Sequence, residues 1–491
     1  MKKTKKKQIG IGAISNPKYP KILADANIRK ILAAIACIIT IALVAVFVSL
    51  NVNGLLKFIA AILVLGIDGQ ILRYLLALEG DMGLIILRWK EGTEKIKRIS
   101  ETLGKYWNDF ADIGLVLSFG LSSKLAFKHI KTKTYIVGML FFLIFVFVIL
   151  PNSGSITLSL IQIPLETVQA ASKMIWISIA ALAIVLLFGV VGFAMFGIIA
   201  NAGMILFSII AFLMGNSAAL ATSSPGVYPV LPYFTIPLFE GLIALLVLMV
   251  VHEGSHGIAS IVAKIRLKST GIITFGFIPV GAFVDIDEKQ LDNKRDIDNA
   301  RVSVAGSTAN LFVALIFFIP TALLMMPAAY SPLSLQNFQQ PILSVTGVVK
   351  NLDFTGENIT IGTKIYSVNG IAVSNTTQYL NVIENLSANS TITLMTNKGE
   401  SKTKMVMDGI PGFVVGQPFK KEFGFIMPIF ATLGLITILN LLVGIVNLLP
   451  IPSFDGHRLF KIIFKEKWIV NVITGIILLS FLMNIVPWIW Q

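Results

Sequence analysis

The residues best suited to chemistry form the motif His252-Glu253-x-x-His256. Two histidines four residues apart lie one turn apart on the same face of an α-helix, so their imidazoles can hold one Zn²⁺. Glu253 can then act as a general base on a water molecule. The pattern therefore indicates metal-assisted hydrolysis. The alternative is that His252 and Glu253 form a hydrogen-bonded packing pair and that His256 lies at a membrane interface.

The motif lies in an apolar run from about Pro237 to Ala263, which is long enough to span a bilayer. Ionisable side chains are costly at membrane depth and are usually functional there. Three of them within one and a half turns need a partner that offsets their burial. A metal ion is the simplest such partner, so we favour the metal interpretation.

The composition predicts a polytopic membrane protein. Of 491 residues, 55% are hydrophobic and only 13% are charged, which is too apolar for a soluble chain. The net charge of +14 comes largely from short basic runs between apolar segments, a pattern typical of cytoplasmic loops, so we expect no nucleic-acid partner. The single cysteine, Cys37, excludes a disulfide within the chain.

The apolar segments predict about nine transmembrane helices, which begin after a basic cytoplasmic tail over residues 1–30. Residues 113–121 are too short to cross and are expected to be interfacial or re-entrant. Counting crossings from the cytoplasmic tail places His252 and His256 in the cytoplasmic half of the bilayer. The expected spans are 31–50, 55–78, 135–150, a tight hairpin of two within 175–215 that turns near 189–197, then 237–263, 302–326, 428–449 and 469–490.

Two segments are predicted to be non-helical. The apolar run from Phe275 to Val284 contains Gly276, Pro279 and Gly281, which favour a re-entrant β-hairpin-like loop over a helix. Such a loop either pairs with an unwound substrate segment by strand addition or lies at the interface without substrate contact.

Residues 337–421 form the second such segment. They are polar, with short alternating β-prone runs such as 364–368 and 391–394, and they predict a small folded α+β domain on the outer face.

Asp455 is the best-placed candidate for a third metal ligand. Pro450 and Pro452 break the preceding helix near the cytoplasmic face and present Asp455 at the depth of the histidines. A carboxylate is a usual third ligand of zinc. The alternative is that Asp455 only forms a turn with the glycine after it, and His457 is a weaker candidate ligand. Asn310, in the 302–326 span, either orients a ligand or bonds across helices.

The motif at 252–256, followed by Asn447-x-x-Pro450 and Phe454-Asp455-Gly456, resembles the site-2 protease family of intramembrane zinc metalloproteases. The resemblance runs from about Pro237 to the C-terminus, with Phe454 where the family usually has Leu. It implies one Zn²⁺ per chain on His252, His256 and Asp455, with Glu253 as the base. It also implies that Asn447 lies near the substrate or the oxyanion, unless Asn447 serves only helix packing.

Within the insert, Gly362-Thr-Lys-Ile-Tyr-Ser-Val-Asn-Gly370 resembles part of the PDZ domains that many family members carry. Thr363 stands where such domains often have Asp. The resemblance implies a PDZ-like domain that filters substrates by size or binds a substrate end, although the insert can equally be a spacer.

The sequence thus predicts a multi-pass protein of the cell membrane that cleaves peptide bonds within or near transmembrane segments of membrane-embedded protein substrates in the lipid bilayer. A non-catalytic metal-binding protein, either transporter or scaffold, is the alternative, although the chain lacks the internal repeats of many transporters. The oligomeric state is left open. The expected divisions are a tail at 1–30, an accessory transmembrane region at 31–236, a first core half at 237–336, the PDZ-like insert at 337–421 and a second core half at 422–491.

Overall fold

The computed structural model describes most of the chain and divides it into two compact units. Unit 1 comprises Met1–Ile316 and Leu435–Gln491, and unit 2 comprises Phe317–Gly434. Each unit is considered by itself. The residues described are 20, 23, 25–50, 54–153, 175–216, 219–220, 223–227, 230, 235–348, 359–384, 386–387, 390–404 and 413–490.

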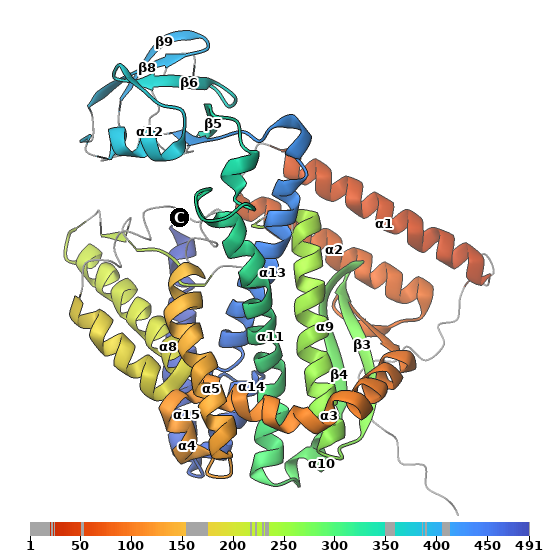
Figure 1. The fold of residues 1–491 in the computed structure, drawn as a ribbon. Coiled ribbons are helices and arrows are strands. Elements are labelled where there is room, and N and C mark those ends of the chain that lie inside the picture. The colour runs from red at the N-terminus through yellow and green to blue at the C-terminus, as the bar shows by residue number, and fades with distance from the viewer. Residues whose placement is uncertain are drawn as a thin grey trace, which may run out of the picture. The chain divides into compact units, whose positions relative to one another are not determined.

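Among these residues, eight helices are long and apolar enough to cross a membrane, which confirms a polytopic membrane protein (Figure 1). Each forms where a predicted apolar run lies, and large apolar side chains remain exposed along them, as expected for surfaces that face lipid. The spanning segments contain α1 (Ala26–Ser49), α2 (Gly54–Leu76), α5 (Thr132–Ile144, continued by a π-helical turn over Phe145–Ile149), α8 (Ile175–Leu213), α9 (Leu238–Val262), α11 (Asp296–Met325), α13 (Ile426–Val446) and α15 (Lys467–Met483).

Helix α8 covers the region for which a hairpin of two crossings within 175–215 was predicted. The helix breaks at Gly189, whose φ of 66° lies in the left-handed region. Among the described residues, this region supplies one of the eight candidate spans, Leu182–Leu213. The break comes at the start of the expected turn because Gly189 packs directly against the backbone of Ser118 and Gly120, which no side chain would allow.

Helix α3 (Lys90–Phe119) is amphipathic and does not qualify as a span. It crosses α9 at a steep angle (Figure 1). Most of its residues from Ala111 to Phe119 are buried, so this predicted interfacial segment is packed inside unit 1.

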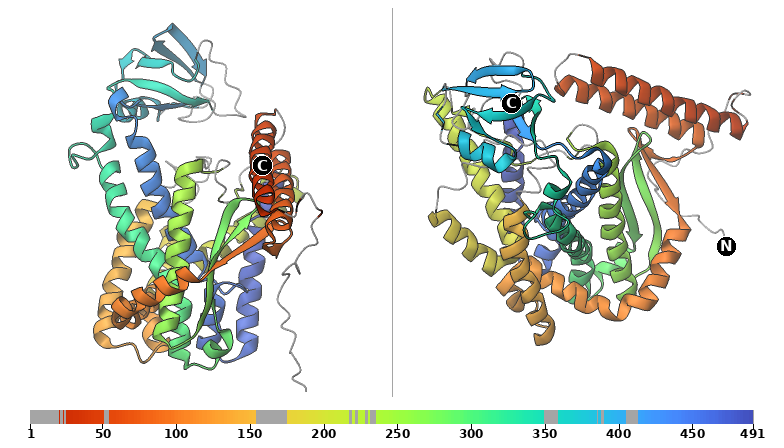
Figure 2. Two further views of the ribbon diagram at one scale, coloured as in Figure 1. Left: turned by 90° about the vertical axis from the view of Figure 1, so that its right-hand side faces the viewer. Right: turned by 45° about the horizontal axis from the view of Figure 1, so that its top comes forward.

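A four-stranded antiparallel sheet lies beside α9 (Figure 2). The predicted re-entrant hairpin is present as its last two strands, with the turn at Gly276 and Phe277. The first two strands were not predicted; a turn at Met82 and Gly83 followed by the β-prone run from Leu84 was their signal. The strands follow chain order: β1 (Glu79–Asp81), β2 (Leu84–Trp89), β3 (Leu267–Phe275) and β4 (Ile278–Ile286).

Because β2 pairs with one side of β3, the far side of β4 is an edge of this sheet. The sheet therefore offers an unpaired strand edge next to α9 (Figure 2).

Unit 2 contains a second sheet and the short helix α12 (Thr376–Ile383). Its core is a cluster of buried apolar side chains that includes Leu343, Ile365 and Leu394, with Tyr379 from α12 packed among them. An isolated antiparallel bridge outside the sheet joins Gln339 to Phe419. The sheet order is β10 (Phe413–Gly416), β5 (Leu343–Val348), β6 (Lys364–Val368), β8 (Thr391–Thr396) and β9 (Gly399–Lys404), with β7 (Ile371–Ala372) paired to β6.

Candidate metal centre

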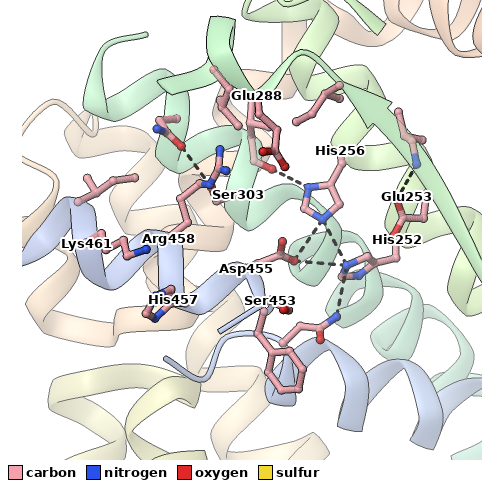
Figure 3. Close-up of a pocket in the computed structure, with 18 of the residues that line it drawn as sticks. His252, Glu253, His256, Glu288, Ser303, Ser453, Asp455, His457, Arg458 and Lys461 are labelled. Atoms are coloured by element: carbon pink, nitrogen blue, oxygen red, sulfur yellow. Dashed lines mark hydrogen bonds and ion pairs between the residues drawn. The ribbon is translucent and has the colours of Figure 1, made fainter. Parts of the chain in front are cut away.

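Helix α9 brings the two histidines together. Buried residues recur along one face of the helix, and His252 belongs to that face together with Ala244, Leu248 and Ser255. One turn on, His256 points to the same place, and the Nε2 atoms of the two imidazoles lie 3.2 Å apart (Figure 3). The regular geometry of the helix is sufficient to position this pair.

Asp455 reaches the histidines from a broken stretch of backbone between α13 and α14 (Asp455–Ile463). The N–H of Gly456 donates to the carbonyl of Asn447 at 2.8 Å and closes the loop between the helices. Ser453 within this loop has a φ of 76°, a strained conformation for a residue with a side chain. Asp455 is then the first residue of α14, where the helix dipole favours a carboxylate.

The three side chains could hold a tetrahedral metal ion. The Oδ2 atom of Asp455 lies 3.3 Å from Nε2 of His252 and 3.2 Å from Nε2 of His256. A tetrahedron with metal–ligand bonds of about 2.0–2.1 Å has edges of about 3.3 Å, so the spacing fits Zn²⁺. The set of two nitrogens and one carboxylate also leaves a fourth position open, as in catalytic zinc sites.

The space between the ligands is kept open by Gly306 of α11. A Cβ atom at this position would collide with Nε2 of both His252 and His256. The helix therefore presents only backbone to the centre, and this supports the fit of an ion there.

Both histidines are oriented from their other ring nitrogen. The Nδ1–H of His256 donates to the carbonyl of Val302 at 2.7 Å, which leaves the Nε2 lone pair for a metal. Nδ1 of His252 lies 3.0 Å from the Asn310 amide, whose Oδ1 is buried without a partner among the described residues. Exchanging the amide O and N would make this oxygen the acceptor of Nδ1–H and leave Nε2 of His252 free for a metal.

The carboxylate of Glu253 lines the same cavity as the two histidines but points to the sheet (Figure 3). Its Oε2 accepts a hydrogen bond from the backbone N–H of Val284 on β4 at 3.0 Å. This N–H belongs to the unpaired edge of the strand, because in an antiparallel sheet alternate residues direct their backbone groups to opposite sides. Ala282, two residues earlier, faces the same edge.

A cavity of about 870 Å³ adjoins the three side chains and extends along α14 and the start of α11. Asn447 lines it and donates from Nδ2 towards Nε2 of His252 at 3.3 Å.

Burial raises the pKa of the Asp455 carboxyl, but His256 and His252 outweigh burial and hold this pKa below its usual range. The carboxylate is thus ionised and matches a cation.

His457 also lines the cavity but lies apart from the ligand cluster (Figure 3). Its Nδ1 lies 3.4 Å from the hydroxyl of Thr474. Burial, reinforced by the charge of Lys461, lowers the pKa of His457. The structure therefore brings His252, His256 and Asp455 together and leaves out His457, the weaker candidate.

Sequence reasoning missed Val302, Gly306 and Val284, which act here through backbone atoms or through the absence of a side chain. The small residues that open the 302–326 span were a signal for close packing, but they did not indicate which partner packs there. No sequence pattern indicates which backbone N–H a carboxylate will bind.

Comparison with known proteins agrees with this geometry. An uncharacterized protein of Methanocaldococcus jannaschii, MJ0971, is 26% identical over 239 residues, which cover 47% of this chain and 60% of that protein. The sequence profile of Peptidase family M50 matches residues 240–485, a region that holds every candidate ligand. The resemblance that the motifs predicted is confirmed: the chain belongs to Peptidase family M50, the site-2 protease family.

Proposed function

We propose that this protein is a zinc-dependent intramembrane endopeptidase that hydrolyses peptide bonds within or near the transmembrane segments of other membrane proteins. The observation that carries the proposal is the convergence of the three ligand atoms, all within 4.8 Å of one another, next to Glu253 in a helix long enough to span the bilayer. Family membership supports a peptidase reaction.

His252, His256 and Asp455 would hold the ion. When bound, Zn²⁺ supplies a Lewis acid that polarises the peptide carbonyl and makes water more acidic. Glu253 takes a proton from the attacking water and passes it to the leaving amine. Asn447 directs its amide N–H groups to the place where negative charge develops on the carbonyl oxygen.

The edge of β4 would bind the substrate. An intact substrate helix hides its carbonyls in hydrogen bonds to residues four positions on, so it must unwind before hydrolysis. Ala282 lines the cavity, and its backbone groups at this edge can pair with an unwound segment by strand addition. Since Val284 already binds Glu253, pairing places the segment beside the base.

The charges at the helix ends support an active site in the cytoplasmic half of the bilayer. Helix α9 ends six residues after His256 and is followed by Lys264, Arg266 and Lys268. The segment after Asp455 carries Arg458 and several lysines. Basic loops remain in the cytoplasm, so these ends face inward, and the insert lies outside. We propose that the insert is PDZ-like and selects substrates by size or by binding one end.

The test is cleavage of a panel of single-span reporter proteins by the purified protein in lipid vesicles, compared with Glu253→Gln. This substitution keeps the side-chain shape and the metal ligands but removes the base. Loss of at least about 100-fold in turnover, with unchanged metal content, supports the proposal. Equal cleavage by both proteins would contradict the role of Glu253 as the base. No cleavage by either, while metal crosses the vesicle membrane, would instead favour the transporter.

A further inference from the structure

Helix α3 precedes the region matched to the family, yet it packs against α9, which carries the two histidines, and against α11, which lies beside them. Against α9, the Trp107 indole N–H donates to the Ser255 carbonyl at 3.4 Å, next to His256. On the same interface, Ile96 of α3 lies against Gly257, where an added Cβ would stand 3.0 Å from the Ile96 side chain. Helix α3 thus contacts Ser255 and Gly257, the two residues of α9 on either side of His256.

Helix α3 approaches α11 as closely. A Cβ at Gly114 would collide with the Thr308 side chain, so this glycine permits direct contact of the two helices. Thr308 lies two residues before Asn310, which contacts His252. The approach is further supported by the Phe110 and Phe312 rings, whose centroids are 5.0 Å apart.

The strongest link is an ion pair between Asp112 of α3 and Arg301 of α11. It is bidentate, with Nε to Oδ1 at 2.8 Å and NH2 to Oδ2 at 2.6 Å, and the Asp112 side chain is only 3% exposed. Planar pairing of this kind fixes direction as well as distance. Removing one partner of such a pair leaves an uncompensated buried charge.

Arg301 is adjacent to Val302, the residue whose carbonyl accepts the hydrogen bond from Nδ1 of His256. The pair therefore holds the first turns of α11 at the residue that orients a metal ligand. An N-terminal helix outside the family region is thus connected to the metal centre through one carboxylate, one guanidinium and one backbone carbonyl.

We propose that Asp112 is a positioning residue: through Arg301 and the Val302 carbonyl it sets the orientation of His256, so that α3 is part of the metal centre's support and not only an accessory helix. Substitution of residues that orient a metal ligand typically weakens metal binding by about 10- to 100-fold. The inference rests on the proposed metal site but not on the peptidase reaction.

The test uses the full-length protein in detergent, loaded with Co²⁺, whose visible absorption reports the geometry of its ligands. The variants are Asp112→Asn and the double variant Asp112→Asn with Arg301→Gln, which leaves no unpaired buried charge and so keeps a folded form available. The matched control is Asp296→Asn, which breaks the exposed 2.6 Å ion pair between Lys465 and the same helix α11. The Co²⁺ spectrum and the metal dissociation constant, from competition with a chelator, are measured on the folded fraction.

We expect both Asp112 variants to bind metal about 10-fold more weakly and to show a changed Co²⁺ spectrum, with Asp296→Asn like the native chain. An unchanged spectrum and dissociation constant in the folded double variant would overturn the positioning role, even if its thermal stability fell. A native chain that binds no metal would instead refute the metal site itself, so the two failures are distinguishable.

Discussion

The two halves of the metal centre are built in different ways. Helix α9 supplies His252 and His256 from one regular helix, whose periodicity alone puts them on one face. The segment between α13 and α14 supplies Asp455 from irregular backbone, with a left-handed Ser453 and a hydrogen bond from Gly456 back to Asn447. One half depends on repetition, the other on a single loop conformation.

This difference predicts where the metal centre tolerates an added side chain and where it does not. On α9 the space beside Gly254 is open, with nothing within 4 Å of an added Cβ. At Gly456 an added Cβ would collide with the carbonyls of Leu448 and Leu449. The same chemical change should therefore be tolerated in the first half and not in the second.

The largest effect is expected from Gly456→Ala, with Gly254→Ala as the matched control in the other half. The new methyl group must push the loop away from Leu448, so Asp455 leaves the ligand cluster and both metal content and peptidase activity are lost. Gly254→Ala should bind metal like the native chain. Metal analysis of the two purified variants measures this difference. Equal metal content in both would contradict the claim that only the irregular half is sensitive to an added methyl group.

The next effect concerns Asn447→Ala, in the irregular half. If its amide donates to the developing oxyanion, turnover should fall by about 100- to 1,000-fold. Metal binding should change far less, because Asn447 is not a ligand. Turnover and metal content are measured on the same preparation. A loss of metal that matches the loss of turnover would reassign Asn447 to ligand support.

A smaller effect is expected from Asn310→Ala, which removes the polar contact to Nδ1 of His252 in the regular half. Metal affinity should fall by about 10- to 100-fold, as is typical when a residue that orients a ligand is lost. Asn310→Asp should restore most of the affinity, because its carboxylate accepts from Nδ1–H. Chelator competition measures both variants, and native affinity in Asn310→Ala would leave Asn310 with a packing role only.

The smallest effect is expected from His457→Asn. His457 lines the cavity, but its Nδ1 is near Thr474 and it lies outside the ligand cluster. Metal affinity should remain within about twofold of native, in contrast to Asp455 two residues earlier. A loss above tenfold would mean that the irregular half supplies a histidine and not a carboxylate ligand.

The features that could be predicted from the sequence follow the same division between regular and irregular backbone. The motif at 252–256 and the apolar runs are local patterns, so the histidine pair and the spans were predicted from periodicity and length. The re-entrant hairpin was predicted from its closely spaced glycines and proline. Asp455 was predicted from the helix break at Pro450 and Pro452 and from counting crossings, and the family resemblance implied it as well.

The remaining features depend on contacts between distant segments. Strands β1 and β2 extend the predicted hairpin to a sheet because Leu84 to Trp89 pair with β3, far along the chain. The break at Gly189 is set by its contact with the Ser118–Gly120 backbone. The support of His256 by Asp112 joins residues of three helices, and no local pattern indicates such a connection.

The central claim is that the two halves form one metal site, and Asp455→Asn tests it most directly. Asparagine keeps the size of the side chain but replaces the charged ligand oxygen with a neutral amide. The measurement is zinc bound per chain in the purified protein, for the native chain, Asp455→Asn and His256→Ala. The account predicts one zinc per native chain and a large loss in both variants. Full zinc content in Asp455→Asn, with loss only in His256→Ala, would contradict it.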